Sequence, residues 1–131
     1  LVTLLIGVNN QYQSKAFSVY ESEFIELVNY AISFVGGDAA KLIIISIPDY
    51  AYTPYGQNGN PQDISADIDM YNSFAEDYAE ENSLTYVYIT DITREGLNNP
   101  NLVALDGLHP SGLAYTKFVE RILPFALGKV D

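Results

Sequence analysis

Three short apolar stretches divide the chain, at residues 1–8 (LVTLLIGV), 41–48 (KLIIISIP) and 84–92 (LTYVYITDI). They are rich in Leu, Ile, Val, Thr and Tyr, and the first two are nearly continuous. Strands that are buried on both faces have this pattern, whereas strands with one wet face alternate apolar and polar residues. The three stretches therefore predict strands of a parallel sheet that is covered by helices.

The segment between the first two predicted strands has a helical pattern. Ser18 and Glu21 have the spacing of a capping box, which predicts a helix start at Ser18. Gly36-Gly37 predicts its end, because glycine accepts the left-handed conformation of a helix stop. Its apolar face recurs at steps of three and four residues, at Tyr20, Phe24, Leu27, Val28, Ala31 and Val35.

Two further helices are predicted by the same periodicity. One covers residues 65–81, with most of its acidic side chains on the face opposite the apolar one. The other begins near Pro110, since proline suits the first turn of a helix. Pro124 is expected to kink or end this last helix, because it lacks the amide hydrogen that the helix interior needs.

Strands that alternate with helices indicate one α/β domain, three layers thick (α/β/α), with no repeats or second domain. The flavodoxin-like arrangement has five parallel strands in the order 2-1-3-4-5. Three strands match the back portion of such a sheet, strands 3-4-5. Because the chain opens inside a strand-like run without Met, we expect residues 1–131 to be the C-terminal part of a longer domain.

Composition and charge exclude several function classes. The 131 residues carry 17 acidic and 6 basic side chains, a net charge of −11, which disfavours nucleic acid and anionic lipid as partners. No apolar run approaches the roughly 20 residues of a membrane span. The absence of Cys excludes a thiol nucleophile and zinc–thiolate sites but assigns no compartment, so cytoplasm, periplasm and secretion stay open.

A long loop at residues 48–64 follows the second predicted strand. Tyr50, Tyr52 and Tyr55 lie in it among three prolines and two glycines. Loops of this length are usually functional or disordered. One interpretation is a solvated crossover, and the other is that the three tyrosines wall a substrate cleft. The loop leaves the carboxyl end of a strand, where open α/β sheets bind ligands.

The first predicted strand ends in Gly7-Val8-Asn9-Asn10. Gly7 allows the backbone to approach a ligand closely, and a short amide side chain just past a strand tip can donate to it. We expect Gly7, Asn9 and Asn10 to border the ligand. The motif alone is weak, because short Gly-x-Asn matches arise readily by chance.

The only histidine, His109, has Asp106 three residues before it and Pro110 directly after. Residues three apart in a turn that enters a helix lie close enough for the carboxylate to bond one ring nitrogen. A general base needs this arrangement, since the carboxylate orients the ring and stabilises the imidazolium. The alternative is an exposed histidine with an incidental acidic neighbour. One His and scattered carboxylates form no metal-ligand set, so no metal or other cofactor is expected.

These pieces occur in the order of the SGNH, or GDSL-type, hydrolases, and the sequence resembles that family over essentially its whole length. "LLIGVNNQYQ", "IPDYAYTPYG" and "DGLHPSGLAY" are similar to the third block, the following loop and the last block of a bacterial lysophospholipase-like or esterase-like member. The resemblance implies that Asn9 is an oxyanion donor and that Asp106 and His109 are the acid and base of a Ser-His-Asp triad. It also implies a small-molecule ester as substrate.

Two features depart from the family pattern. Asn10 stands where the family has Asp, and the chain has no Gly-Asp-Ser block. Ser14, Ser18, Ser46 and Ser111 do not match that block, so the nucleophile is expected outside these 131 residues and this chain alone is expected to be inactive.

The absent front portion has a second consequence. In the 2-1-3-4-5 order the first strand of this chain would pair with a strand that the chain lacks. We expect its bare edge to be covered by self-association or by the missing N-terminal segment.

The rival hypothesis for the function is a non-catalytic flavodoxin-like binding module or a degenerate hydrolase. A phospho-receiver form has only Asp49, at a strand end, in its support.

Overall fold

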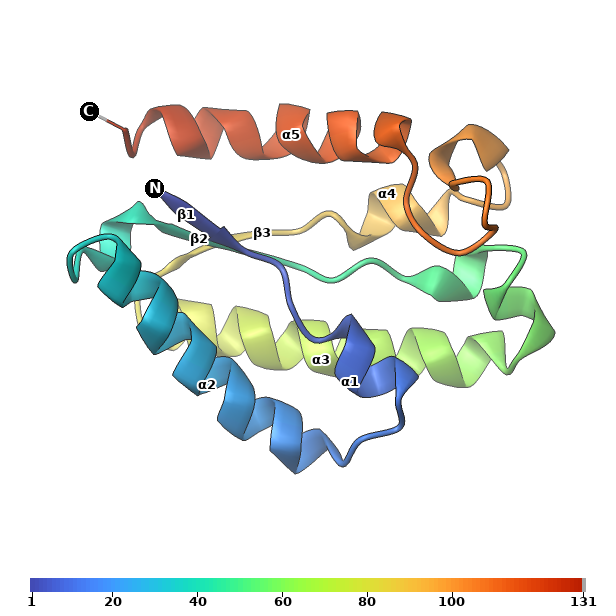
Figure 1. Ribbon diagram of the computed structural model, residues 1–131, viewed down its shortest axis with the longest axis horizontal. Coiled ribbons are helices and arrows are strands. Elements are labelled where there is room, and N and C mark those ends of the chain that lie inside the picture. Colours follow the sequence, from blue (N-terminus) through green and yellow to red (C-terminus); the bar gives the residue numbers. More distant parts are fainter. Residues whose placement is uncertain (131) are drawn as a thin grey trace.

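The computed structural model describes residues 1–130, which form a three-stranded parallel sheet between two layers of helices (Figure 1). The strands are β1 (Val2–Leu4), β2 (Leu42–Ile45) and β3 (Thr85–Val87). They lie side by side in the order β1-β2-β3, and both pairings are parallel. The prediction of a parallel α/β sheet is confirmed.

The central strand β2 separates two apolar cores. All four of its residues are buried. Leu42 and Ile44 join one core cluster, whereas Ile43 and Ile45 join the other. This alternation follows from the two-residue period of a strand, and it explains why a strand that is covered on both sides reads as a continuous apolar run.

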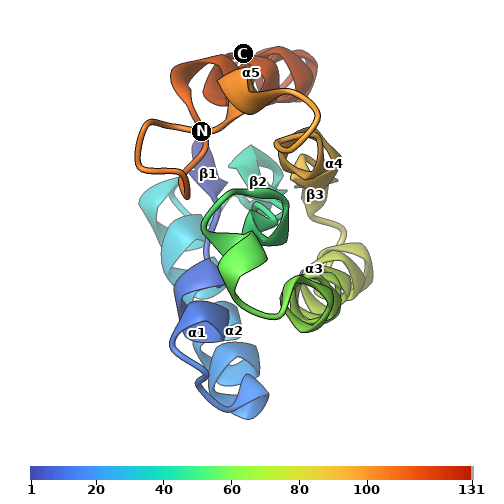
Figure 2. The ribbon, with the colours of Figure 1, turned by 90° about the vertical axis from the view of Figure 1, so that its right-hand side faces the viewer.

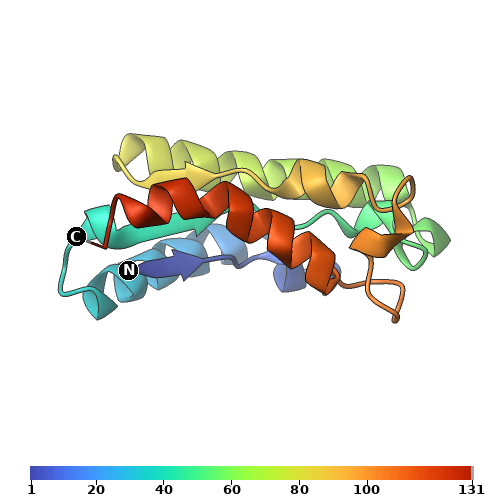
Figure 3. The same ribbon diagram turned by 90° about the horizontal axis from the view of Figure 1, so that it is seen from above.

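Helices cover both faces of the sheet (Figure 1). α2 (Phe17–Phe34) and α3 (Pro61–Glu81) lie on one face, with the short α1 (Val8–Tyr12). α5 (Gly112–Leu127) and the short α4 (Thr90–Arg94) lie on the other. Seen from above, β1 runs along one margin of the molecule and α3 along the opposite one (Figure 3). In residues 1–130, no helix is long and apolar enough to cross a membrane.

The first long helix has the predicted end but not the predicted cap. Gly36 and Gly37 have φ angles of 69° and 83°, so the helix stops where only glycine enters the left-handed region without strain. At the other end Ala16 is the N-cap residue, and no side chain caps the helix. The capping box at Ser18 and Glu21 was wrong, because helical backbone already begins at Phe17.

Two of the predicted strands are shorter than their apolar runs. The first ends before Gly7, whose φ angle of 127° turns the chain into α1. The third ends at Val87, and residues 90–92 belong to α4. There Ser46 Oγ accepts hydrogen bonds from the backbone amides of Ile89 and Thr90, so these amides are not available to a strand ladder.

The boundaries of the last two long helices also differ from expectation. α3 begins at Pro61, four residues before the predicted start, because Asn60 caps it by accepting from the amide of Asp63. α5 begins at Gly112 with Ser111 as its cap. Pro124 was expected to kink or end α5 but lies inside it. This position is exposed, so water can satisfy the carbonyl that loses its helical partner.

The long loop after β2 is compact. It contains two 3₁₀ turns, Tyr50–Tyr52 and Gly56–Asn58. The two turns pack so closely that a Cβ on Gly56 would lie 1.9 Å from the carbonyl oxygen of Tyr50. Backbone contact of this kind holds the loop in one shape, and that shape forms part of the candidate site.

Candidate active site

Three segments meet at the carboxyl end of the sheet (Figure 2). They are α1 after β1, the loop after β2, and residues 102–110 before α5, and together they line a cavity of about 310 Å³. Asn9, Tyr50 and His109 are among the lining residues. The other lining residues are mostly apolar: Val8, Pro48, Leu102, Val103, Leu108 and Pro110, with Tyr12, Asp49, Thr53 and Thr93.

Asp106 holds His109 through a tight local turn. Its Oδ2 lies 2.6 Å from Nδ1 of the His109 ring. Its Oδ1 accepts from the backbone amides of Leu108 and His109, at 2.9 and 3.0 Å. Gly107, with a φ angle of 72°, allows the reversal. Because Nδ1 faces the carboxylate, Nε2 is the ring nitrogen left free to react.

The same three contacts keep the carboxylate ionised. The amides of Leu108 and His109, followed by the His109 ring, lower the pKa of Asp106 from 3.8 to about 2. Asp106 therefore stays negatively charged throughout the neutral range. The side chain of His109 is 70% exposed, so the ring is open to a reacting group on its free side.

Asn9 lies in α1 and lines the cavity. Its side chain has no hydrogen bond to any other residue in the described part of the chain, and it is exposed at the cavity. Gly7, just before α1, does not line the cavity. It fits under Tyr20, because a Cβ at Gly7 would lie 2.6 Å from the ring of that tyrosine. Gly7 thus sets the path of the chain that brings Asn9 to the cavity.

Asn10 points elsewhere. Its Nδ2 donates to Glu23 Oε2 on α2, at 2.9 Å, and it is not among the cavity residues. The expectation that Asn10 borders the ligand is not met by this geometry. Asn10 lies about 100° further around α1 than Asn9, on the side where Glu23 of α2 accepts from its amide.

The three tyrosines of the loop do not lie in one place. Tyr50 lines the cavity and donates from its hydroxyl to Gln11 Oε1 at 2.7 Å, and burial raises its pKa. Tyr52 lines a different hollow, on the side of α3. Tyr55 is not a lining residue, but its hydroxyl lies 2.7 Å from that of Tyr12, which is one. Of the three tyrosines predicted to wall the cleft, only Tyr50 lines this cavity, and Tyr12 from α1 lines it as well.

Tyr12 and Asp49 are two further residues that line the cavity and that the sequence alone did not assign to it. Tyr12 lies three residues after Asn9 on α1, so a helical interpretation of residues 8–12 would have placed both on one face. Asp49 is fully buried. Its Oδ2 accepts from Ser65 Oγ at 2.6 Å and from Arg94 Nε at 2.9 Å, and its Oδ1 accepts from the amide of Ala51.

Arg94 connects this buried carboxylate to the surface. Burial alone would lower the pKa of its guanidinium, but hydrogen bonds to Asp69 and Asp49 raise it above the usual value. Three donors from the protein thus hold the Asp49 carboxylate. These contacts fix the loop that carries Tyr50.

No serine lines the cavity in residues 1–130. Ser111 caps α5 and donates to the carbonyl of Asn101. Ser46 accepts from Ile89, and Ser65 donates to Asp49. No group of three His, Cys, Asp or Glu side chains within the described chain is placed to hold a metal ion.

Comparison with known proteins matches this arrangement to one family. Residues 1–117 match the model of the GDSL-like lipase/acylhydrolase family. No curated protein matches the chain significantly. Among solved structures, a GDSL-like lipase from Bacteroides thetaiotaomicron is similar at a TM-score of 0.72 and 21% identity, over 99% of this chain and 63% of that one.

Two further solved structures have the same fold. A variant of an acetyl xylan esterase from Geobacillus stearothermophilus has a TM-score of 0.65 at 20% identity, over 95% of this chain and 58% of that one. An alpha/beta hydrolase from the metagenome of Lake Arreo has a TM-score of 0.63 at 16% identity, over 99% of this chain and 60% of that one. The chain thus spans about three fifths of the length of these structures. With a family match over most of its length, the chain belongs to the GDSL-like lipase/acylhydrolase family.

Proposed function

We propose that this chain supplies the base and the oxyanion donor of a serine-dependent carboxylic-ester hydrolase. His109 is the general base and acid, Asp106 orients it, and Asn9 binds the oxyanion. The observation that carries the proposal is the 2.6 Å contact between Asp106 Oδ2 and His109 Nδ1, with His109 and Asn9 lining one cavity. The nucleophilic serine is contributed by a segment outside residues 1–131.

In the first step, His109 Nε2 takes the proton from the serine hydroxyl while the serine oxygen attacks the carbonyl carbon of the ester. The carbonyl π electrons move to oxygen and form a tetrahedral oxyanion. Asp106 stabilises the imidazolium that results, and its lowered pKa keeps it charged for this task. The imidazolium then donates its proton to the leaving alkoxide, and the alcohol departs.

The second step hydrolyses the acyl-serine. His109 takes a proton from water, the hydroxide attacks the acyl carbon, and the proton returns to the serine oxygen as the acid leaves. In both steps Asn9 Nδ2 donates to the oxyanion, a role that suits an amide without a partner of its own. The apolar part of the cavity, with Val103 and Leu108, suits the acyl or alcohol portion of a small-molecule ester.

The test needs a polypeptide that contains both this chain and the Gly-Asp-Ser block that the proposal expects outside residues 1–131. We expect it to hydrolyse an activated ester such as p-nitrophenyl acetate and to react with a fluorophosphonate probe at a serine. The isolated chain of residues 1–131 should do neither above the rate of free imidazole. Labelling of a serine within residues 1–131, or full activity of His109→Ala, would contradict the proposal.

A further inference from the structure

The short helix α1 carries four polar side chains in succession, and their surroundings differ. Asn9 is exposed at the cavity and has no hydrogen bond to the rest of the described chain. Asn10 and Tyr12 form hydrogen bonds at the surface, with α2 and with the loop after β2. Gln11 is the buried residue of the helix, with an exposed fraction of 9%. Gln11 therefore links α1 to polar groups below the surface.

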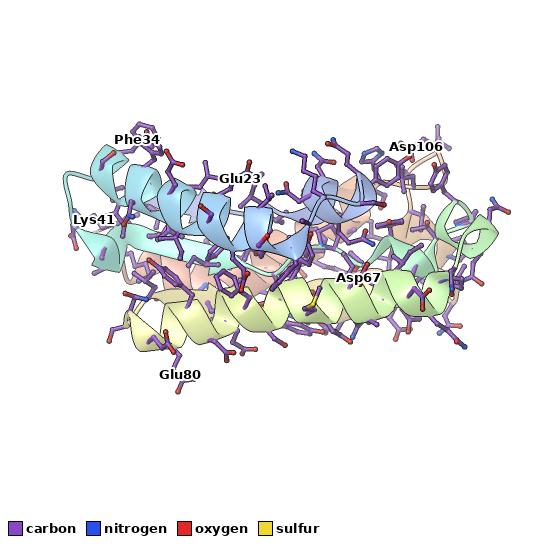
Figure 4. All side chains as sticks on the ribbon, turned by 90° about the horizontal axis from the view of Figure 1, so that it is seen from below. Glu23, Phe34, Lys41, Asp67, Glu80 and Asp106 are labelled. Atoms are coloured by element: carbon purple, nitrogen blue, oxygen red, sulfur yellow. The ribbon has the colours of Figure 1, made fainter. Side chains whose placement is uncertain are left out.

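The side-chain amide of Gln11 joins three elements. Its Nε2 donates to Asp67 Oδ2 on α3 at 3.1 Å, and its Oε1 accepts from the hydroxyl of Tyr50 at 2.7 Å. In the view from below, Asp67 lies on the flank of α3 that faces α1 (Figure 4). Tyr50 belongs to the loop after β2 and lines the cavity. Gln11 thus fixes α1 against α3 and against the loop at the same time.

The chemistry of the two partners determines the orientation of this amide. An ionised carboxylate only accepts hydrogen bonds, so the NH2 group of Gln11 must face Asp67. The carbonyl oxygen of Gln11 then faces Tyr50, whose hydroxyl has to donate. Because both ends of the amide are engaged, the side chain of Gln11 is held in one orientation.

The position of Asn9 depends on how α1 is held. The helix has five residues, and no side chain caps its N-terminus. Isolated helices of this length are not stable in water, so α1 relies on contacts with neighbouring elements. Gln11 follows Asn9 by two residues, which places the two side chains about 200° apart around the helix. The contacts that hold Gln11 inside the protein therefore hold Asn9 at the cavity.

We propose that Gln11 is a positioning residue, whose bonds to Asp67 and Tyr50 fix α1 so that Asn9 Nδ2 meets the oxyanion. This role rests on the proposed function, in which Asn9 is the oxyanion donor. Gln11 does not line the cavity, so it acts through Asn9 and not on the substrate. A donor must be preorganised where the charge develops, and a misplacement of about 1 Å can cost about 10²-fold in rate.

Swapping the amide of Gln11 with the carboxylate of Asp67 tests the proposal, in the polypeptide that contains this chain and the nucleophilic serine. Gln11→Glu sets two carboxylates against each other. It should lower kcat at least about tenfold and change KM less than about threefold, because the oxyanion exists in the transition state and not in the bound ester. The double variant Gln11→Glu/Asp67→Asn should recover kcat to within about threefold, because the amide now on α3 donates to the carboxylate now on α1, which still accepts from Tyr50.

A cycle with Asn9 distinguishes positioning from a merely structural role. Gln11→Met removes both bonds at a similar side-chain volume and should lower kcat at least about tenfold. In an Asn9→Ala background it should lower kcat less than about twofold, because the donor that Gln11 positions is already absent. A general loss of structure would lower kcat in both backgrounds. Gln13→Met, at an exposed glutamine that follows α1, is the matched control and should change kcat less than about twofold.

Amide exchange provides a readout that does not need activity. The backbone amides of Gln11 and Gln13 donate to the carbonyls of Gly7 and Asn9. Both amides should exchange at least about tenfold faster in Gln11→Met and near the unaltered rate in the double variant, since exchange reports local opening.

Three results would overturn the inference: unchanged exchange in Gln11→Met, an equal loss of kcat in both Asn9 backgrounds, or no recovery of kcat in the double variant. An unaltered protein that lacks esterase activity would contradict the proposed function, and the exchange rates would still decide whether Gln11 holds α1. Normal activity with a large loss in Asn9→Ala but none in Gln11→Met would leave the proposed function standing and remove Gln11 from it.

Discussion

Two aspartates at the carboxyl end of the sheet have opposite surroundings. Asp49 is 0% exposed and accepts hydrogen bonds from Arg94, Ser65 and the amide of Ala51. Asp106 is 51% exposed, and one of its oxygens faces the ring of His109. The first anchors the loop of Tyr50, and the second belongs to the turn that presents His109, the base of the proposed function.

The difference separates stability from reactivity. A buried carboxylate is tolerated only when protein donors replace the water that it loses, and the donors of Asp49 are a guanidinium, a hydroxyl and an amide that hold the loop in place. An exposed carboxylate contributes little to stability but can orient a neighbouring imidazole. Proximity to a cavity is therefore a poor guide to which aspartate is functional, and the partners of its oxygens are a better one.

The largest expected effect is on activity at the exposed pair. In the complete, active protein, Asp106→Asn should lower kcat about 10⁴-fold, because the amide favours the wrong tautomer of His109. His109→Ala should cost at least as much. The free energy of unfolding of Asp106→Asn should change by no more than about 0.5 kcal/mol, since Oδ1 can still accept from the backbone. Steady-state kinetics and urea denaturation measure the two quantities.

The converse substitution is Asp49→Ala, which removes the acceptor of three protein donors. We expect a loss of about 3 kcal/mol in the free energy of unfolding, at the lower end for a broken buried pair because Arg94 can still reach water and Asp69. Urea denaturation measures it. A loss below about 1 kcal/mol would show that the anchor is not needed, and the contrast between the two aspartates would then fail.

Loss of the proposed oxyanion donor, Asn9, should have an intermediate effect on kcat. Asn9→Ala in the active protein should lower kcat by about 10²–10³-fold, or about 2.7–4 kcal/mol, with little change in KM. Asn98→Ala is the matched control, because this exposed asparagine bonds only to Glu95. A loss of less than threefold at Asn9 would remove the residue from the mechanism and leave only the Asp106–His109 pair in it.

The smallest expected effect is on the stability of the protein at acidic pH. The folded-state pKa of Asp106 is lowered from 3.8 to about 2 by the amides of Leu108 and His109 and then by the His109 ring. Its contribution to stability is therefore present above about pH 4 and is lost as the pH falls toward 2. The difference in Tm between the protein and its Asp106→Asn variant should shrink across this window. An Asp106 carboxyl that titrates near 3.8 by NMR would contradict the turn geometry.

Local chemistry explains which elements were predictable. β2 could be predicted because four consecutive apolar residues suit a strand that is buried on both faces. The end of α2 could be predicted because Gly36-Gly37 is itself the stop signal. The start of α4 could not, because it depends on Ser46, more than 40 residues away, accepting from the amides of Ile89 and Thr90.

The site divides in the same way. The contact between Asp106 and His109 spans three residues, so their spacing was enough to predict it. The opposite directions of Asn9 and Asn10 depend on α1, whose start at Gly7 is shaped by the packing of Tyr20. The separation of Tyr52 from Tyr50 depends on the 3₁₀ turn that contains both, because residues two apart in a turn with three residues per turn point in different directions.

By itself, the sequence determined the alternation of strands and helices, the central strand and the Asp106–His109 turn, because each arises from side chains within a few residues of one another. Only the tertiary structure decided that Asn9 and His109 share a cavity and that Asp49 is buried against Arg94. Those outcomes depend on contacts between residues that are far apart along the chain, and no local pattern encodes them.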